Sequence, residues 1–245
     1  MSCSCSQPQQ WQLLEKLAQS RTVEVEKLCT DDGHEVVRKS YRFPTVKDRL
    51  RGMWRGTLFG KPKVEREDFH LDYLTRAKVP VITPIRACVI RDSFGFVTDS
   101  HLITAASPGQ RLDYLLSQNQ MPAPEVWAAI GSSLSRMHQV SFWHRGLAPR
   151  NLLIHDQAPF HFWLDPAKSV IHSGGIRQAA RADDLLRFWA GLHEQVPQEH
   201  KHAFEQAYGQ EGVSDPANIW PAIPKGKRAA AERVIRRDAT RFGKS

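Results

Sequence analysis

The stretch HRGLAPRN, residues 144–151, decides the predicted fold. It follows a segment whose apolar residues recur every three or four positions, the pattern of an amphipathic helix: Val126, Ile130, Leu134 and Met137. It precedes the short apolar run LLIH, which is typical of a buried strand. A polar, proline-containing segment between a helix and a strand predicts a loop.

The same residues match the catalytic loop of protein kinases, H-R-D-L-x-x-x-N, at every fixed position but one. Gly146 stands where that pattern has the aspartate that accepts the proton of the substrate hydroxyl. The chain is therefore a kinase that has lost its base, a kinase that works without it, or no kinase. The rest of the sequence has to separate these three hypotheses.

The first part of the chain predicts strands and a single helix after an initial helical segment. Residues 11–20 carry apolar residues on one helical face, and 23–28 and 35–41 alternate like the two strands of a hairpin. The turn DDGH, residues 31–34, joins those strands, with glycine supplying a positive φ. A helix follows from Lys63 to about Lys78, ended by proline, and the runs VPVITPI, ACVI and GFVTD predict further strands.

The second part predicts helices around one pair of strands. Helices are expected after SPGQ, after Pro124, from Arg177 to His193 and from Gln198 to Tyr208, and LLIH and FHFWLD form the strands. This order predicts an α+β protein-kinase-like fold with two lobes in one domain. The strand-rich N-lobe is expected over residues 1–100 and the helical C-lobe over residues 101–245.

Two oxygen-bearing side chains follow the loop at spacings that suit magnesium. Asn151 closes the loop, and Asp165 ends the strand FHFWLD, where the kinase pattern has the metal-binding aspartate of D-F-G. Amide and carboxylate oxygens are ligands that Mg²⁺ accepts. Taken alone, an asparagine orders a turn and an aspartate before proline begins one. Together they predict a metal pair.

A lysine and a glutamate in the N-lobe suit the phosphates of ATP. Lys39 in VVRKSY matches the V-A-I-K lysine, and a helical glutamate is needed to hold it in place. Glu67 shares a helical stripe with apolar residues whereas Glu65 does not, so Glu67 is the preferred partner. Strand periodicity alone leaves Arg38 open as an alternative to Lys39.

Five further side chains complete the candidate set. Asp184, with Asp183 as the competing choice, is a buried acid that could hold the loop by hydrogen bonds. We group His144 with Asn151 and Asp165 in the catalytic set, although packing beneath the loop is its expected role. Asp99 is assigned to the cofactor-binding set with Lys39 and Glu67. Asp99 and Asp156 are also candidates for the missing base.

The net charge of +8 is concentrated in one segment. Residues 38–63 contain nine Lys or Arg and one acid, Asp48. Such a segment suits an anionic partner, a phosphorylated sugar or lipid headgroups, or is a solvated basic loop. Nucleic-acid binding would rest on basicity alone, and we do not predict it. The four cysteines lack metal-ligand spacing, so we expect neither a zinc site nor a disulfide scaffold.

The chain resembles the lipopolysaccharide kinase family of Kdo/WaaP type, small bacterial relatives of the protein kinase fold. The resemblance covers residues 23–192 and is carried by RGMWRGTLFGKPKVERE, HLDYLTRAKVPVITPI, RMHQVSFWHRGLAPRNLLI, FWLDPAKS and RADDLLRF. It implies transfer of the γ-phosphoryl group of ATP, with Mg²⁺, to a sugar hydroxyl of the lipopolysaccharide inner core. It also implies a reaction at the cytoplasmic face of the inner membrane, and the basic charge of residues 38–63 suits a peripheral contact of this cytoplasmic protein with that membrane.

Three departures from that family pattern define an alternative. Gly146 replaces the loop aspartate, no glycine-rich phosphate loop precedes the hairpin, and Asp165 is followed by proline and alanine instead of Phe-Gly. General-base catalysis contributes about 10²- to 10⁴-fold, so loss of the base predicts a slow kinase. The alternative is a pseudokinase that binds a nucleotide, a glycolipid or a protein without turnover.

Overall fold

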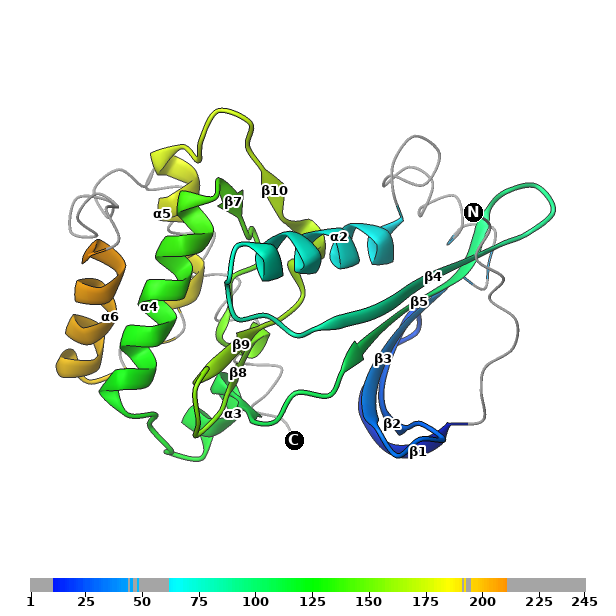
Figure 1. Ribbon diagram of the computed structural model, residues 1–245, viewed down its shortest axis with the longest axis horizontal. Coiled ribbons are helices and arrows are strands. Elements are labelled where there is room, and N and C mark those ends of the chain that lie inside the picture. The colour runs from blue at the N-terminus through cyan, green and yellow to red at the C-terminus, as the bar shows by residue number, and fades with distance from the viewer. Residues whose placement is uncertain are drawn as a thin grey trace. The chain divides into compact units, whose positions relative to one another are not determined.

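A computed structural model describes residues 11–43, 45, 48, 62–190, 192 and 195–210 of the protein. The chain divides into two compact units (Figure 1). The first comprises Met1–Tyr73 and Ile82–Ser107, and the second comprises Leu74–Val81 and Pro108–Ser245. Antiparallel strands dominate the first unit and helices the second, which confirms the predicted α+β class. Each unit is described by itself below.

The first unit is built on a five-stranded antiparallel sheet in the order β1-β2-β3-β5-β4. Its strands are β1 (Gln12–Gln19), β2 (Val23–Cys29), β3 (Glu35–Arg42), β4 (Pro84–Arg91) and β5 (Val97–Ala105). The predicted β2–β3 hairpin is confirmed, and Gly33 in its turn has a φ of 81°. Strand β5 continues past residue 100, so it belongs to this unit over its whole length.

The prediction of a helix over residues 11–20 is wrong, because this segment forms edge strand β1. It pairs with β2 through two register shifts, one at Leu13/Glu15 and one at Lys16/Ala18. Every residue of β1 is exposed, so its leucines cover no core. Backbone pairing with β2 has overridden a local pattern that favoured a helix, as tertiary context often does.

Helix α2 (Lys63–Arg76) lies in the chain between β3 and β4 and confirms the predicted helix. Its buried stripe consists of Val64, Glu67, Leu71 and Leu74, which recur at three- and four-residue intervals. A carboxylate in the middle of an apolar stripe requires a partner, because burying an unpaired charge is costly. The pair that it forms is described in the next section.

The second unit contains four helices among its described residues, with short strands between them. The helices are α3 (Leu112–Ser117), α4 (Pro124–Gln139), α5 (Gln178–Trp189) and α6 (Gln198–Gln210). One small sheet has the order β6-β8-β9 and another pairs β10 with β7. These strands are β6 (Gln110–Arg111), β7 (Phe142–Trp143), β8 (Leu152–Ile154), β9 (His161–Trp163) and β10 (Val170–Ile171). Two short 3₁₀ turns, Pro149–Asn151 and Pro166–Lys168, flank β8 and β9.

The core of the second unit forms where α4 packs against α6. A Cβ on Gly131 would come within 2.3 Å of the Phe204 carbonyl oxygen, so glycine allows the two helices to approach closely. Phe204 stacks on Phe188 at a ring distance of 5.5 Å, which brings α5 into the same cluster. Helices packed in this way give the rigid base from which the loop at residues 144–151 emerges.

Several predicted boundaries differ from the structure. The run VPVITPI contributes only an isolated bridge at Val81 before β4 begins at Pro84. Helix α3 begins at Leu112, after the short strand β6. Cys88 is disulfide-bonded, which the cysteine pattern did not predict. Within the described residues, no helix is long and apolar enough to span a membrane.

Candidate functional site

The first unit holds a buried ion pair between Lys39 of β3 and Glu67 of α2. The Lys39 Nζ lies 2.9 Å from one Glu67 carboxylate oxygen and 3.2 Å from the other. The Glu67 side chain is 2% exposed and that of Lys39 is 18% exposed. The Tyr41 hydroxyl lies 3.3 Å from the same carboxylate and can donate to it. The predicted pairing is therefore present, and Lys39 keeps some access to solvent.

Register explains why these residues and not their neighbours form the pair. Lys39 lies directly opposite Val25 on β2 and Leu102 on β5, so it shares their face of the sheet. Arg38 points to the other face and donates to Glu26, at 2.8 Å. Glu65 lies off the buried stripe of α2 and is partly exposed. The fold therefore selects Lys39 over Arg38 and Glu67 over Glu65.

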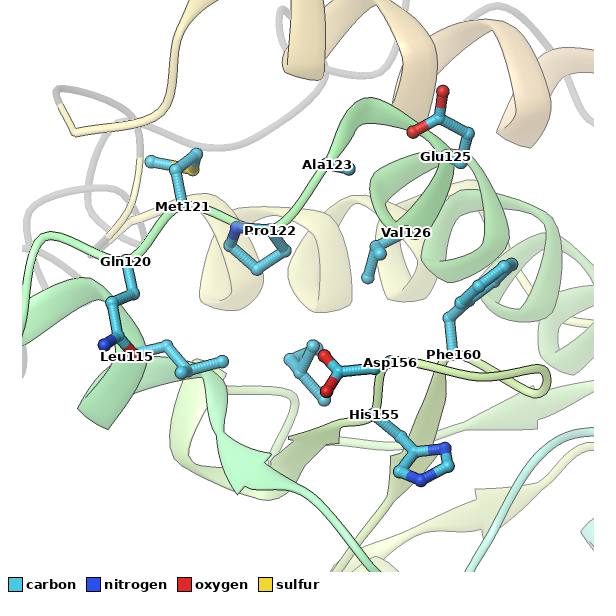
Figure 2. A pocket seen from close by; sticks show the side chains of 11 residues that line it. Leu115, Gln120, Met121, Pro122, Ala123, Glu125, Val126, His155, Asp156 and Phe160 are labelled. Carbon is cyan, nitrogen blue, oxygen red and sulfur yellow. The ribbon is translucent and has the colours of Figure 1, made fainter.

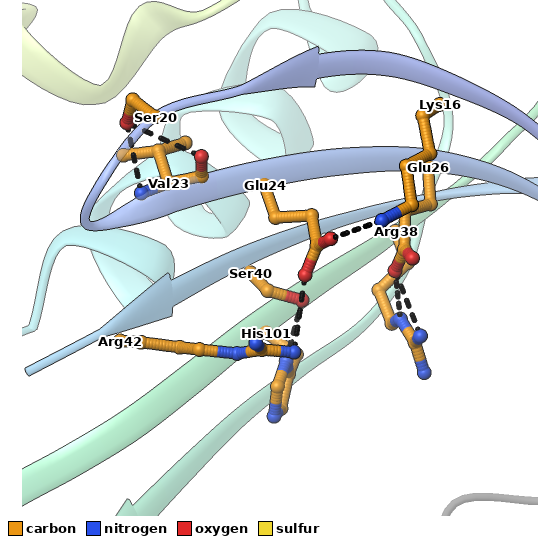
Figure 3. A network of polar contacts seen from close by, with 9 residues as sticks. All are labelled: Lys16, Ser20, Val23, Glu24, Glu26, Arg38, Ser40, Arg42 and His101. Carbon is orange, nitrogen blue, oxygen red and sulfur yellow. Dashed lines mark hydrogen bonds and ion pairs between the residues drawn. The ribbon is translucent and has the colours of Figure 1, made fainter. Parts of the chain in front are cut away.

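Asp99 does not lie with Lys39 and Glu67. It pairs in register with Arg42, on the sheet face that also carries Arg38. Figure 3 shows the polar network of this opposite face, in which Glu24, within salt-bridge distance of Lys16 and Arg42, lies near Ser40 and His101. Grouping Asp99 with Lys39 in one cofactor-binding set is therefore corrected, because alternate residues of a strand point to opposite faces.

The second unit fixes the loop at residues 144–151 through Asp184 of α5. Its two carboxylate oxygens accept the backbone N–H groups of His144, at 2.8 Å, and Arg145, at 2.9 Å. Asp184 is fully buried and also lies 3.4 Å from the His138 ring. Asp183 instead pairs with Arg187 of the same helix. The expectation that Asp184 holds the loop is confirmed, and Asp183 is excluded from that role.

His144 is part of the loop's support. Its ring is fully buried and its Nε2 lies 3.2 Å from the Leu164 carbonyl oxygen, which it can reach only as a donor. Burial lowers the pKa of His144 below the usual histidine range, against the opposing effect of Asp184 and Asp165. A buried, neutral imidazole suits the structural role. Within the predicted catalytic set, His144 therefore has the role of positioning the loop.

The backbone of Leu164 ties Asp165 to the loop. Its N–H donates to the Asn151 carbonyl oxygen at 2.9 Å, while its own carbonyl faces His144. Asp165 follows directly, in the left-handed conformation with φ 51° and ψ 53°. Aspartate tolerates this region better than most residues, but it remains sparsely populated. Strain held by surrounding contacts is characteristic of functional positions.

The amide of Asn151 is oriented within the loop. Its Nδ2 donates to the Gly146 carbonyl oxygen at 2.8 Å. This bond fixes which end of the amide is nitrogen, so the oxygen points the other way. Asn151 and Asp165 thus offer hard oxygen donors of the kind Mg²⁺ takes together with phosphate oxygens. Within the described residues, no group of three or more His, Cys, Asp and Glu could hold a metal by itself.

Gly146 is not required by the backbone of the loop. Its φ lies outside the left-handed region, and a Cβ built there would lie 3.7 Å from its nearest neighbour, the His144 Nδ1. That distance is an ordinary van der Waals contact. A side chain at this position would therefore fit, and the glycine removes a functional group without relieving strain.

Asp156 lies away from the loop. It follows β8, while Asn151 precedes it, so the two residues stand at opposite ends of that strand. Asp156 helps to line a pocket of about 450 Å³ with mainly apolar walls, and its carboxylate points into that pocket (Figure 2). Because a strand rises about 3.3 Å per residue, Asp156 is too far away to act as the missing base.

Most of the basic segment at residues 38–63 lies outside the described residues. Of its described members, Lys39, Arg38 and Arg42 each pair with a glutamate: Glu67, Glu26 and Glu24, respectively. Their charges are thus largely compensated within the sheet. The contact predicted for this segment with an anionic partner remains a prediction.

Sequence reasoning missed two supporting residues. Tyr41 contacts Glu67, and it lies two positions after Lys39, so strand periodicity already placed it on the same face. His138 joins Asp184 to Tyr208, whose hydroxyl lies 2.7 Å from its Nδ1. Nothing local in the sequence indicates that link, because its three members come from α4, α5 and α6.

A strand lysine paired with a helix glutamate, and a loop held from below by a buried aspartate, define a protein-kinase-like fold. A solved structure described as "WaaP in complex with acyl carrier protein" shares this fold, with a TM-score of 0.56 over 90% of this chain and 89% of the other, at 16% identity. The model of the lipopolysaccharide kinase (Kdo/WaaP) family matches residues 8–208. The chain belongs to this family.

Curated relatives carry the name 3-deoxy-D-manno-octulosonic acid kinase. One from Mannheimia succiniciproducens is 31% identical over 133 residues, which cover 49% of this chain and 55% of the relative. One from Pasteurella multocida is 23% identical over 167 residues, which cover 62% of this chain and 68% of the relative. One from Haemophilus influenzae is 27% identical over 154 residues, which cover 56% of this chain and 64% of the relative. The chain thus spans roughly half to two thirds of the length of these relatives.

Proposed function

We propose that the chain is an ATP-dependent phosphotransferase that acts slowly on a sugar hydroxyl of the lipopolysaccharide inner core. Membership of the lipopolysaccharide kinase family supports a sugar kinase in general. The names of the relatives support a 3-deoxy-D-manno-octulosonic acid residue as the acceptor. The proposal places the reaction at the cytoplasmic face of the inner membrane.

The observation that carries the proposal is the Lys39–Glu67 pair. A buried ion pair is weak evidence for stability, because desolvation offsets much of the attraction. A lysine that contacts both oxygens of one carboxylate yet is 18% exposed is suited to the α- and β-phosphates of ATP. Asn151 and Asp165 would hold Mg²⁺, which would neutralise charge that develops on the phosphates. Lys39 and Glu67 bind and orient the nucleotide, and Asp184 keeps the loop in place.

The slow rate follows from Gly146. Phosphoryl transfer passes through a loose transition state, so positioning and charge neutralisation supply most of the acceleration. A general base adds about 10²- to 10⁴-fold to such a reaction. The chain is thus expected to transfer phosphate at a rate reduced by about that factor.

The test is transfer of labelled γ-phosphate from ATP, with Mg²⁺, to vesicles that contain lipid A bearing 3-deoxy-D-manno-octulosonic acid. We expect the wild type to label the glycolipid and Asp165→Asn to lose at least about a hundredfold. Asparagine tolerates the left-handed conformation at this position, so the variant should fold. Asp156→Asn, at the far end of β8, is the matched control and should keep full activity.

A pseudokinase is the second candidate, and Gly146 is the observation that favours it. It predicts that the wild type binds ATP but labels no acceptor, and that Asp165→Asn changes no cellular phenotype. Nucleotide binding without any transfer, over a long incubation and with Mg²⁺ present, would replace the first proposal with this one.

A further inference from the structure

The β4–β5 hairpin of the first unit ends in a turn that projects from the sheet (Figure 1). The last pair between β3 and β5 is Arg42 with Asp99, so residues 92–96 lie beyond the paired part of β3. Phe94, at the tip of this turn, is 84% exposed. A large aromatic side chain that is almost wholly in water is unusual, because such residues dominate cores and interfaces.

Hydrogen bonds hold this turn in one shape. The Asp92 carboxylate accepts the backbone N–H groups of Phe94, at 3.0 Å, and Phe96, at 2.9 Å. The backbone N–H of Gly95 donates to the Asp92 carbonyl at 2.9 Å, and Gly95 has the positive φ that the turn needs. Arg91 donates from its guanidinium to the Gly95 carbonyl oxygen at 2.9 Å. Phe94 is therefore presented outward by a well-bonded turn.

The strand that leads into the turn carries two exposed isoleucine–arginine pairs, separated by three half-buried residues. Ile85 is 57% exposed and Ile90 is 40% exposed, and Arg86 and Arg91 are exposed beside them. Between Ile85 and Phe96 the only acid is Asp92, whose carboxylate is engaged by the backbone. Aromatic and aliphatic side chains flanked by arginines are the composition of elements that lie in a membrane interface.

We propose that the β4–β5 hairpin is a membrane-docking element that places Phe94 in the headgroup region of an anionic bilayer. Ile90 and Arg91, next to the turn, then lie closest to the headgroups, and Ile85 and Arg86 lie further back along β4. The inference rests on the proposed function for its purpose, because a glycolipid acceptor is embedded in a membrane. Lipid binding itself needs no nucleotide, so it can be measured separately.

The structure favours lipid over a protein partner at this hairpin. β4 is an edge strand, but Pro84 and the two register shifts in its pairing with β5 make it a poor template for an added strand. A stable protein interface buries about 800 Å² on each partner, far more than one hairpin tip offers. A bilayer accepts a single protruding aromatic residue with flanking cations.

The expected affinity is modest. Burying a phenylalanine side chain changes a partition constant by about tenfold or more, and each arginine near an anionic surface adds about fivefold. Docking through this hairpin is thus weak and reversible.

The experiment is vesicle flotation with the full chain and no nucleotide. Vesicles of phosphatidylcholine alone are compared with vesicles that also contain phosphatidylglycerol, and the variants are Phe94→Ser and Arg86→Gln combined with Arg91→Gln. Tyr114→Ser, which alters an aromatic side chain that is 54% exposed on α3, is the matched control. Melting temperatures confirm that each variant is folded.

We expect binding to the phosphatidylglycerol vesicles that falls about tenfold in Phe94→Ser and is unchanged in Tyr114→Ser. The double arginine variant should lose the preference for anionic lipid. The inference is wrong if the wild type does not float, if both aromatic variants behave alike, or if Phe94→Ser removes only self-association. Failure of flotation with phosphate transfer intact counts against the hairpin alone. Flotation without transfer counts against the proposed function alone.

Discussion

The two compact units preserve different parts of the protein-kinase sequence pattern. In the first unit the lysine and the glutamate are both present and paired at 2.9 Å, on elements far apart in the sequence. In the second unit the loop is held by Asp184, Asn151 and Leu164, yet Gly146 leaves it without the base. The first unit retains the paired lysine and glutamate of the kinase pattern, and the second retains Asn151, Asp165 and the loop around an absent aspartate.

The loop at residues 144–151 keeps its hydrogen-bonded shape with glycine at position 146. Asp184 binds the backbone N–H groups of His144 and Arg145, which every residue possesses. No support of the loop described above passes through a side chain at position 146. The shape of the loop therefore depends on contacts to its backbone. An aspartate at position 146 would affect the rate of catalysis and not the shape of the loop.

The largest effect is expected from restoring the base. Gly146→Asp should raise the rate of phosphate transfer by about 10²- to 10⁴-fold, because a general base would again accept the hydroxyl proton. Single-turnover transfer from labelled ATP to the glycolipid measures this rate. Gly146→Ala is the control for the backbone effect and should leave the rate nearly unchanged. Equal rates in all three proteins would mean that another group already acts as the base.

Removing the loop's anchor comes next. Asp184→Ala removes the acceptor of the backbone N–H groups of His144, which is buried, and Arg145, so the free energy of unfolding should fall by about 3 kcal/mol. Urea unfolding followed by circular dichroism measures this change. Asp183→Ala is the matched control and should cost less than about 1 kcal/mol, since the side chain of its partner Arg187 is 45% exposed. Similar losses in both variants would remove the special role assigned to Asp184.

The nucleotide-binding assignment is tested by a pair of neighbouring cations. Lys39→Met should weaken ATP binding by about tenfold or more, since it removes a charge contact to the phosphates. Arg38→Met, on the opposite face, should leave the affinity unchanged. Isothermal titration with ATP and Mg²⁺ gives both values. The reverse order of effects would show that the nucleotide does not use the Lys39 face.

Acidification should destabilise the second unit through its buried histidines. Burial lowers the pKa of His161 to about 3 and also lowers that of His144. In the unfolded chain histidine titrates near pH 6.5, so below that pH the unfolded state binds more protons than the folded state. The free energy of unfolding should then fall as the pH drops below 6.5, by up to about 1.4 kcal/mol per pH unit for His161, and the buried His144 adds to this fall.

Unfolding in urea at a series of pH values checks this slope. His161→Gln should make the slope shallower than that of the wild type, because one proton fewer is taken up on unfolding. A wild-type stability that stays flat between pH 6.5 and pH 4 would contradict the burial of these rings as neutral groups.

The sequence predicted most of the fold because its motifs are local. HRGLAPRN, the hairpin turn at residues 31–34 and the apolar stripe of α2 each lie within one element and its flanks. The same stripe identified Glu67, because a carboxylate among buried residues needs a cation. The positions of Asn151 and Asp165 in the kinase pattern could also be predicted, because each belongs to a local motif.

The structural features that the sequence did not predict depend on pairing between segments far apart in the chain. Strand β1 was misread as a helix because its identity comes from its partner β2, and its leucines point to solvent. Asp99 was grouped with Lys39 because strand register is invisible until β3 and β5 are aligned. The link from His138 to Tyr208 likewise joins residues from distant parts of the chain, and the disulfide at Cys88 was not predicted either.

The most direct test of the central claim is the melting temperature of the wild type, Lys39→Met and Asp165→Asn, with ATP alone, Mg²⁺ alone and both. A ligand that binds only the folded state stabilises it by about 2.7 kcal/mol at a hundredfold excess over its dissociation constant. We expect ATP with Mg²⁺ to raise the melting temperature of the wild type by about 5 °C or more and to have little effect on either variant. No shift in the wild type, or the same shift in all three proteins, would contradict a working nucleotide site.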